Sequence, residues 1–179
     1  VRKLTEGNPI RFCLCRATGQ IETLGAIHAF PDRDLVLVPA EGAQAILGRV
    51  EQFVVLEDVQ AVIADEPAHL ILGEGLSVGR GRAVVLGDVP DLPIVPEPEA
   101  EFTRLWHREP RWGLDIFEKT LPPELGEAFE VDHVSYEKGC FLGQEVLHRI
   151  YARGHTNWTW VVLQADESVK GVLVKSVKD

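Results

Sequence analysis

Methionine, long apolar runs and an apolar N-terminal stretch are all missing from this chain of 179 residues. Methionine is absent even at position 1, which predicts that the natural start lies upstream of residue 1. No apolar run approaches the ~20 residues that a membrane-spanning helix needs, and residues 1–5 lack the apolar stretch of a signal peptide. We therefore expect a cytoplasmic protein with no membrane partner.

Positive charge is also scarce, since 18 Lys and Arg residues face 28 Asp and Glu residues and leave a net charge of −10. The average field of such a chain repels phosphate, so we expect no direct binding of nucleic acid. Apolar residues make up 45% of the sequence and charged residues 26%, which is typical of a globular protein with an ordinary core.

Cysteine occurs three times, at Cys13, Cys15 and Cys140. A small, odd number argues against a disulfide framework. Two thiols without a second pair make a poor zinc site, so no metal is expected. Cys13 and Cys15 are two residues apart in a predicted strand, so we expect both to be buried on one face of it.

The hydrophobic pattern of the first half predicts short strands around one amphipathic helix. Strands are expected at 10–16, 21–30, 35–38, 54–64, 70–72 and 82–86, and the helix at 41–53. This order favours an α+β fold, in which antiparallel or mixed sheets pack against helices. We expect a single sheet with helices on one face.

The second half has a different pattern, because prolines interrupt it. Four prolines predict an extended connection over 88–98, and the pattern then predicts a helix over 98–108 and irregular structure over 110–135. A last helix is expected over 142–153, with Gly154 as its terminating residue. Two final strands are expected over 158–163 and 169–175.

The most informative stretch reads K-G-C-F-L-G-Q-E-V-L-H-R over residues 138–149. It resembles the signature of the YgfZ-like folate-binding proteins, which are related to the glycine cleavage T-protein, an aminomethyltransferase. The resemblance implies a T-protein/YgfZ-like folate-binding fold. It implies a folate-binding α+β domain over residues 1–154, followed over 155–179 by a short β remnant of a truncated or minimal C-terminal barrel domain.

The residues of this motif also suit a reactive site on physical grounds. Cys140 is expected just before the N-terminus of the last helix, where helix N–H groups and Lys138 would favour its thiolate form. The alternative interpretation is a buried cysteine in a tight turn. Glu145 and Arg149 have the spacing of a helical ion pair, and with Gln144 and His148 they lie off the apolar stripe of the helix.

An upstream stretch extends the resemblance. Residues 104–115 resemble the family segment R-[LI]-x-x-G-x-P-x-x-G-x-E, with Arg108 in place of the first glycine and Asp115 in place of the glutamate. In the T-protein relatives that glutamate meets the pterin end of folate, and a carboxylate can accept two hydrogen bonds there. A solvated aspartate is the alternative. The predicted cofactor-binding residues are Arg104, Trp112, Asp115, Lys138, Gln144, Glu145 and Arg149.

Three functions are compatible with these residues. The first is a folate-binding auxiliary factor that uses Cys140 as its catalytic or reactive group in the maintenance of iron–sulfur enzymes, including those that modify tRNA. Its cofactor would be tetrahydrofolate or a folate derivative, and its partners folate and iron–sulfur enzymes. The alternative is a tetrahydrofolate-dependent aminomethyltransferase, although residues 19–24 lack the aspartates of that enzyme. The third is a thiol hydrolase with His148 or His133 as the base.

Overall fold

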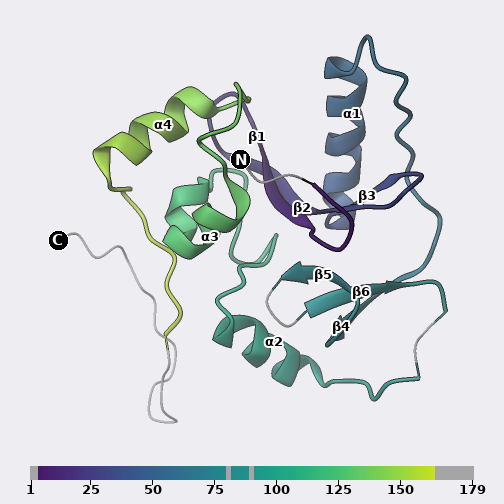
Figure 1. Ribbon diagram of the computed structural model, residues 1–179. Coiled ribbons are helices and arrows are strands. Elements are labelled where there is room, and N and C mark those ends of the chain that lie inside the picture. Colours follow the sequence, from purple (N-terminus) through teal and green to yellow (C-terminus); the bar gives the residue numbers. More distant parts are fainter. Residues whose placement is uncertain (1–3, 80–81, 89–90, 164–179) are drawn as a thin grey trace.

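A computed structural model gives the fold and describes residues 4–79, 82–88 and 91–163. Within these ranges the chain forms two separate three-stranded antiparallel sheets and four α-helices (Figure 1). The predicted α+β class is therefore confirmed. The expectation of a single sheet is wrong, because among the described residues no ladder joins the strands before α1 to those after it, and the later strands form a sheet of their own.

The first sheet has the order β1-β2-β3, built from Ile10–Cys15, Ile21–Ala29 and Asp34–Leu37. These strands are where alternation of apolar residues predicted them. β1 and β2 pair antiparallel from Ile10 opposite Ile27 to Cys15 opposite Ile21, with an irregular step between Leu14 and Cys15.

Helix α1, Ala43–Phe53, follows the first sheet and confirms the predicted amphipathic helix. Its Arg49 donates to Glu22 of β2 over 2.7 Å, which fixes α1 against the sheet. The strand predicted over 54–64 is wrong. A strand needs a partner to bond its backbone groups, and this segment pairs with none of the described strands; Leu56 is 94% exposed there.

The second sheet has the order β4-β6-β5, built from Ala68–Leu72, Leu76–Gly79 and Arg82–Leu86. The strands predicted at 70–72 and 82–86 are confirmed as parts of β4 and β6. The short strand β5 was not predicted, because glycines stand at both of its ends and only four residues remain. Nε2 of His28 in β2 lies 3.0 Å from the carbonyl oxygen of Ser77, which connects the two sheets.

Three helices follow the second sheet: α2 over Glu97–Trp106, α3 over Glu127–His133 and α4 over Gln144–Arg153. α2 and α4 confirm the predicted helices, and Gly154 ends α4 in the left-handed region with φ of 75°. The irregular structure predicted over 110–135 is wrong in part, because the 3-10 helix Pro122–Leu125 and helix α3 lie inside that range. Both are too short to show a helical period.

The chain beyond α4 has no regular structure as far as residue 163. The strand predicted over 158–163 is therefore wrong. Instead, the backbone N–H of Trp160 donates to the carbonyl oxygen of Glu124 over 2.6 Å as a single contact. The strand predicted over 169–175 lies outside the described residues.

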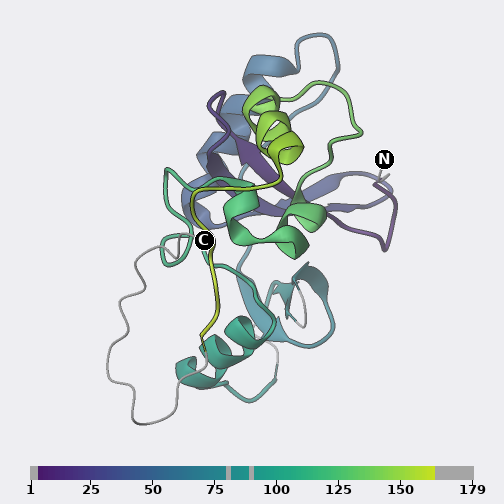
Figure 2. The same cartoon turned by 90° about the vertical axis from the view of Figure 1, so that its left-hand side faces the viewer.

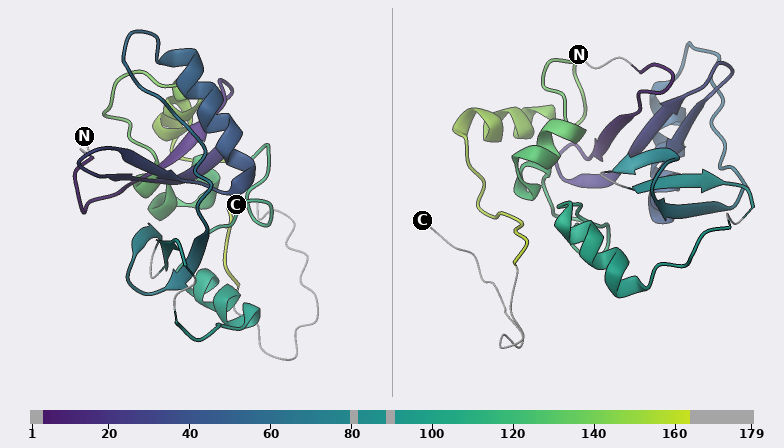
Figure 3. Two further views of the ribbon diagram at one scale, coloured as in Figure 1. Left: turned by 90° about the vertical axis from the view of Figure 1, so that its right-hand side faces the viewer. Right: turned by 60° about the horizontal axis from the view of Figure 1, so that its bottom comes forward.

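A small core joins the first sheet to the C-terminal half of the chain. It contains Ile21 of β2, Ile116, Leu125 and Phe129 of α3, and Trp112 and Trp160 pack against it. Figures 2 and 3 show α1 on one side of the first sheet and α3 with α4 on the other. This arrangement brings α3 and the motif before α4 alongside β1.

Candidate functional site

A cleft of about 660 Å³ lies where β1, α3 and the segment 134–141 meet. This volume is within the range of small-molecule sites, roughly 300–1,000 Å³. Four aromatic side chains line it, together with four carboxylates and several further polar or sulfur-containing residues. These are Phe12, Tyr136, Phe141 and Tyr151; Glu127, Glu130, Asp132 and Glu137; and Arg11, Cys13, Cys15, His133 and Lys138.

β1 supplies one wall of the cleft, through Ile10, Arg11, Phe12, Cys13 and Cys15. Cys15 is buried and Cys13 is half-buried. Burial raises the pKa of the Cys15 thiol to about 11 and raises the pKa of Cys13 well above its usual value. Both thiols are therefore protonated at neutral pH and act as inert, polarisable surface.

α3 supplies the opposite wall, and His133 is its most unusual residue. The ring is 6% exposed and stacks on Phe129 with centroids 3.9 Å apart. Nδ1 lies 2.9 Å from the carbonyl oxygen of Phe129. Burial, with a contribution from the charge of Arg11, lowers the pKa of His133 to about 4, so the ring is neutral at pH 7.

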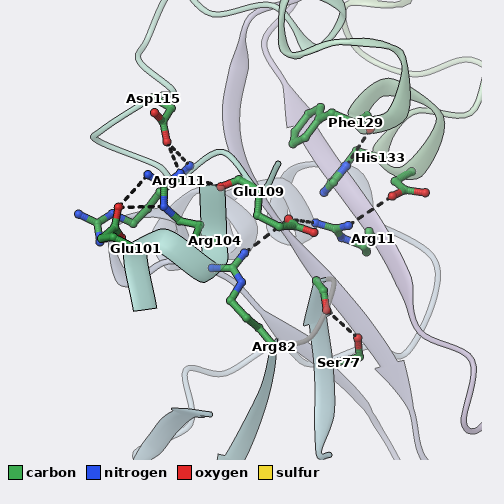
Figure 4. A network of polar contacts seen from close by, with 12 residues as sticks. Arg11, Ser77, Arg82, Glu101, Arg104, Glu109, Arg111, Asp115, Phe129 and His133 are labelled. Atoms are coloured by element: carbon green, nitrogen blue, oxygen red, sulfur yellow. Dashed lines mark hydrogen bonds and ion pairs between the residues drawn. The ribbon is translucent and has the colours of Figure 1, made fainter. Parts of the chain in front are cut away.

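Arg11 is held by carboxylates on both of its terminal nitrogens (Figure 4). Nη2 lies 2.6 Å from Oε2 of Glu109, and Nη1 lies 3.4 Å from Oδ2 of Asp132. Glu109 is 3% exposed and also meets Nη2 of Arg82 in β6 at 3.4 Å. Neutralisation of this kind is what allows a guanidinium to remain charged away from water.

A second ion-pair group contains two of the predicted cofactor-binding residues. Nη1 of Arg104 lies 2.6 Å from Oδ2 of Asp115, and Arg104 also pairs with Glu101 at 2.8 Å. The same Asp115 oxygen accepts the backbone N–H of Arg111 at 2.9 Å, and Oδ1 accepts Nε1–H of Trp160 at 3.2 Å. Both carboxylate oxygens therefore have partners, and neither Asp115 nor Arg104 lines the cleft.

Trp112 does not line the cleft either, because its ring packs against the core of Ile21, Ile116, Leu125 and Phe129. Of the predicted cofactor-binding residues, Lys138 is the one that lines the cleft. Its Nζ lies 4.9 Å from the ring centroid of Phe141. The predicted cofactor-binding residues therefore include one residue of this cleft and two residues of a separate ion-pair group.

The motif that contains Cys140 forms a turn ahead of α4. The helix begins at Gln144, two residues later than predicted, so Cys140 lies outside its first turn, with an exposed side chain. Oε1 of Gln144 accepts the backbone N–H of Phe141 at 3.1 Å and stabilises the turn. Glu145 and Arg149 are both exposed, and no ion pair joins them in the described part of the chain.

The backbone at position 143 of the motif requires a glycine. Its φ is 84°, a left-handed conformation, and a Cβ there would lie 2.5 Å from the carbonyl oxygen of Arg16 and 2.9 Å from Cα of Gly19. The turn before α4 therefore packs directly on the turn between β1 and β2. By contrast, a Cβ on Gly139 would meet nothing within 4 Å.

His148 and His133 were the two candidate bases for Cys140, and the structure puts them in different surroundings. The ring of His148 packs edge-on against Tyr136, with centroids 5.0 Å apart at 70°. His133 lines the cleft and Cys140 does not. No hydrogen bond joins Cys140 to either ring among the described residues. Sequence reasoning missed His133 as a cleft residue, because α3 was expected to be irregular.

The described residues lack two further features. In residues 4–79, 82–88 and 91–163, no three His, Cys, Asp or Glu side chains gather as metal ligands would. Nor does any helix in those ranges have the length and apolar character to cross a membrane. A scan against protein-family models and a search of curated proteins found no match to this chain.

Proposed function

We propose that this protein is a YgfZ-like folate-binding protein that binds tetrahydrofolate in the cleft between β1 and α3. The observation that carries the proposal is that Lys138 and Phe141, which flank Cys140 in the motif, line the same cleft as β1 and α3. A motif that resembles a folate-binding signature and a cleft of small-molecule size are therefore parts of one structure. The protein would be an auxiliary factor for iron–sulfur enzymes, with Cys140 as its reactive group.

The chemistry of the cleft suits the parts of folate. Aromatic rings from Phe12, Tyr136 and Phe141 offer flat surfaces to a pterin and an aminobenzoyl ring. Carboxylates of α3 can accept hydrogen bonds from an amino group, and Glu127 has no ion pair among the described residues. Lys138 is exposed at the rim, where a cation can meet the carboxylates of the glutamate tail.

Cys140 supports the proposal by its accessibility. It is the exposed cysteine of the three, whereas Cys13 and Cys15 are held in the wall of the cleft. An exposed thiol beside a ligand cleft can be reached by a partner protein while the cleft is occupied. This arrangement suits a protein that assists other enzymes more than one that closes around its own substrate.

Calorimetry with tetrahydrofolate tests the proposal, using Lys138→Gln and Lys119→Gln as a matched pair. Lys119 is exposed and does not line the cleft. We expect Lys138→Gln to weaken tetrahydrofolate binding about two- to fivefold, the effect of losing a solvated ion pair, and to leave the binding of pterin itself unchanged. Lys119→Gln should bind both like the wild type.

Two results would count against the proposal. Absence of binding heat for tetrahydrofolate in the wild type removes the cofactor. Equal weakening in both lysine variants shows a general charge effect and removes the cleft as the site. The role of Cys140 is tested in cells that depend on this protein, where Cys140→Ser should lower the activity of iron–sulfur enzymes without changing tetrahydrofolate affinity.

A further inference from the structure

Helix α2 has its charged side toward the protein and its aromatic side toward solvent. The side chain of Arg104 is 4% exposed and pairs with Glu101 and Asp115 on the inner side. Phe102 and Trp106 are 66% and 70% exposed, and their rings stack with centroids 6.0 Å apart. A helix on the surface of a globular protein normally buries its apolar stripe, so the arrangement of α2 is inverted.

The aromatic side of α2 is left uncovered by the rest of the described chain. The helix lies at the edge of the fold beside the second sheet (Figure 1), and none of the closely packed pairs of helices and strands in the described ranges includes it. An open groove of about 310 Å³ is lined by Phe102, Thr103, Trp106 and His107. A contiguous aromatic surface that the fold leaves exposed indicates an interaction site.

Opposite charges stand at the two ends of this aromatic surface. Glu99 is exposed in the first turn of α2, three residues before Phe102, which puts the two side chains on neighbouring positions of one face. Arg108 is exposed directly after His107, the residue that caps the helix beyond Trp106. The surface therefore has an acid at one end, two aromatic rings in the middle and a base at the other end.

This order of groups is complementary to itself when the surface is turned by half a revolution. In a twofold arrangement centred between Phe102 and Trp106, the Phe102 ring of each copy faces the Trp106 ring of the other. At a rise of about 1.5 Å per residue, Glu99 lies about 7.5 Å along the helix on one side of the centre and Arg108 about 6 Å on the other side. Each Glu99 is therefore nearly level with Arg108 of the second copy, and opposite charges meet at both ends.

We propose that two copies of this chain associate through α2, with the two helices antiparallel. A Phe or Trp side chain buries about 150–250 Å², so two rings that are each about two-thirds exposed supply roughly 300 Å² from each copy. The total of about 600 Å² is below the ~1,200 Å² of stable complexes, so we expect a weak dimer with a dissociation constant of roughly 100 µM. The surface lies outside the cleft, and the inference does not depend on folate binding.

Sedimentation equilibrium of the whole chain, from about 10 µM to about 500 µM, tests the association. We expect the average mass to rise from 19.9 kDa toward twice that value as the protein concentration increases. Trp106→Ser should weaken self-association at least about tenfold, because it removes the larger ring of the interface. Trp158→Ser is the matched control and should associate like the wild type, since Trp158 is also exposed, at 61%, and lies outside α2.

An exchange of the two charges tests whether the surface pairs with itself. Glu99→Arg and Arg108→Glu should each weaken self-association at least about fivefold, because each substitution places like charges opposite one another at both ends of the interface. An equimolar mixture of these two variants should associate about as tightly as the wild type. In the mixed dimer both ends again have one acid opposite one base.

Three results overturn the inference. A mass that stays at 19.9 kDa over the whole range leaves this side of α2 to a segment of the same chain or to a different protein. Self-association that Trp106→Ser does not weaken places the interface elsewhere on the surface. A mixture of Glu99→Arg and Arg108→Glu that associates no more tightly than either variant alone rules out the antiparallel pairing.

Discussion

The guanidinium of Arg104 and the carboxylate of Asp115 form a close ion pair, with Nη1 and Oδ2 2.6 Å apart. Arg104 is 4% exposed and the Asp115 side chain 15% exposed, so water screens this pair poorly. The pair holds the loop after α2 against the end of that helix. Two residues that the sequence suggested for a ligand are here a structural contact.

Asp115→Ala should therefore lower the free energy of unfolding, by about 2–3 kcal/mol, because a buried guanidinium loses one of its carboxylates. Urea denaturation measures the change. Glu118→Ala is the control, since Glu118 is exposed in the same loop and should change stability by less than about 0.5 kcal/mol. A loss below about 0.5 kcal/mol for Asp115→Ala would show that the pair contributes nothing.

Arg108 is expected to be strained, because it is a residue other than glycine at φ of 52°. The family segment that residues 104–115 resemble has glycine at this position. Arg108→Gly should raise the free energy of unfolding by about 0.5–1 kcal/mol, since glycine adopts this conformation without a steric cost. His107→Gly is the matched control and should lower stability, because His107 has an ordinary φ of −82°. Similar effects of both substitutions would contradict the assignment of strain.

The two motif glycines should respond in opposite ways to alanine. Gly143→Ala combines a left-handed φ of 84° with a contact of 2.5 Å to the Arg16 carbonyl oxygen, so we expect a loss of more than about 2 kcal/mol. Gly139→Ala meets nothing within 4 Å and should change stability by less than about 0.5 kcal/mol. Thermal or urea unfolding compares them. A tolerated Gly143→Ala would mean that the two turns do not pack as described.

His133 predicts a loss of stability in acid. Its pKa is about 4 in the folded protein, against about 6.5 in an unfolded chain, so the unfolded state binds the proton more readily between these values. The contribution of His133 to the free energy of unfolding should therefore be constant above pH 6.5. It should fall as the pH decreases toward 4, by up to about 3 kcal/mol.

Urea denaturation of wild type and His133→Phe at several pH values isolates this contribution from those of other groups, among them Arg11, Glu109 and Asp132. The difference in stability between the two proteins should shift in favour of the variant as the pH falls. A difference that does not vary between pH 7 and pH 4 would contradict the low pKa.

Alkylation should distinguish the three cysteines. Iodoacetamide at pH 7.5 should label Cys140 in the folded protein, because its side chain is exposed, and should spare Cys13 and Cys15, whose thiols stay protonated. Mass spectrometry of the peptides gives the site, and unfolding in urea should make all three cysteines reactive. Labelling of Cys15 in the folded protein at a rate similar to Cys140 would show that the cleft wall opens.

Local sequence patterns predicted the helices and strands that are long enough to show a hydrophobic period. The period of α1, the glycine at the end of α4 and the alternation of β1 and β2 all reflect contacts within a few residues. The failures arose where structure depends on distant partners. Residues 54–64 have strand-like composition without a neighbouring strand, and α3 has only seven residues after a pair of prolines.

The candidate site was predictable only in part, for the same reason. Lys138 was found because it belongs to a recognisable motif, whereas Phe141 of the same motif lines the cleft and was not predicted to do so. The pairing of Arg104 with Asp115 involves residues 11 apart that meet through a loop, and no spacing rule shows it. Nε2 of His133 is buried without a hydrogen-bond partner among the described residues because β1, α3 and the loop after α2 pack around it. These segments are separated in the sequence, so no single one of them predicts this environment.

Glu109 receives guanidinium groups from Arg11 in β1 and from Arg82 in β6, so one carboxylate is shared by the two sheets. A displacement of the second sheet would therefore move a carboxylate that holds Arg11 in the wall of the cleft.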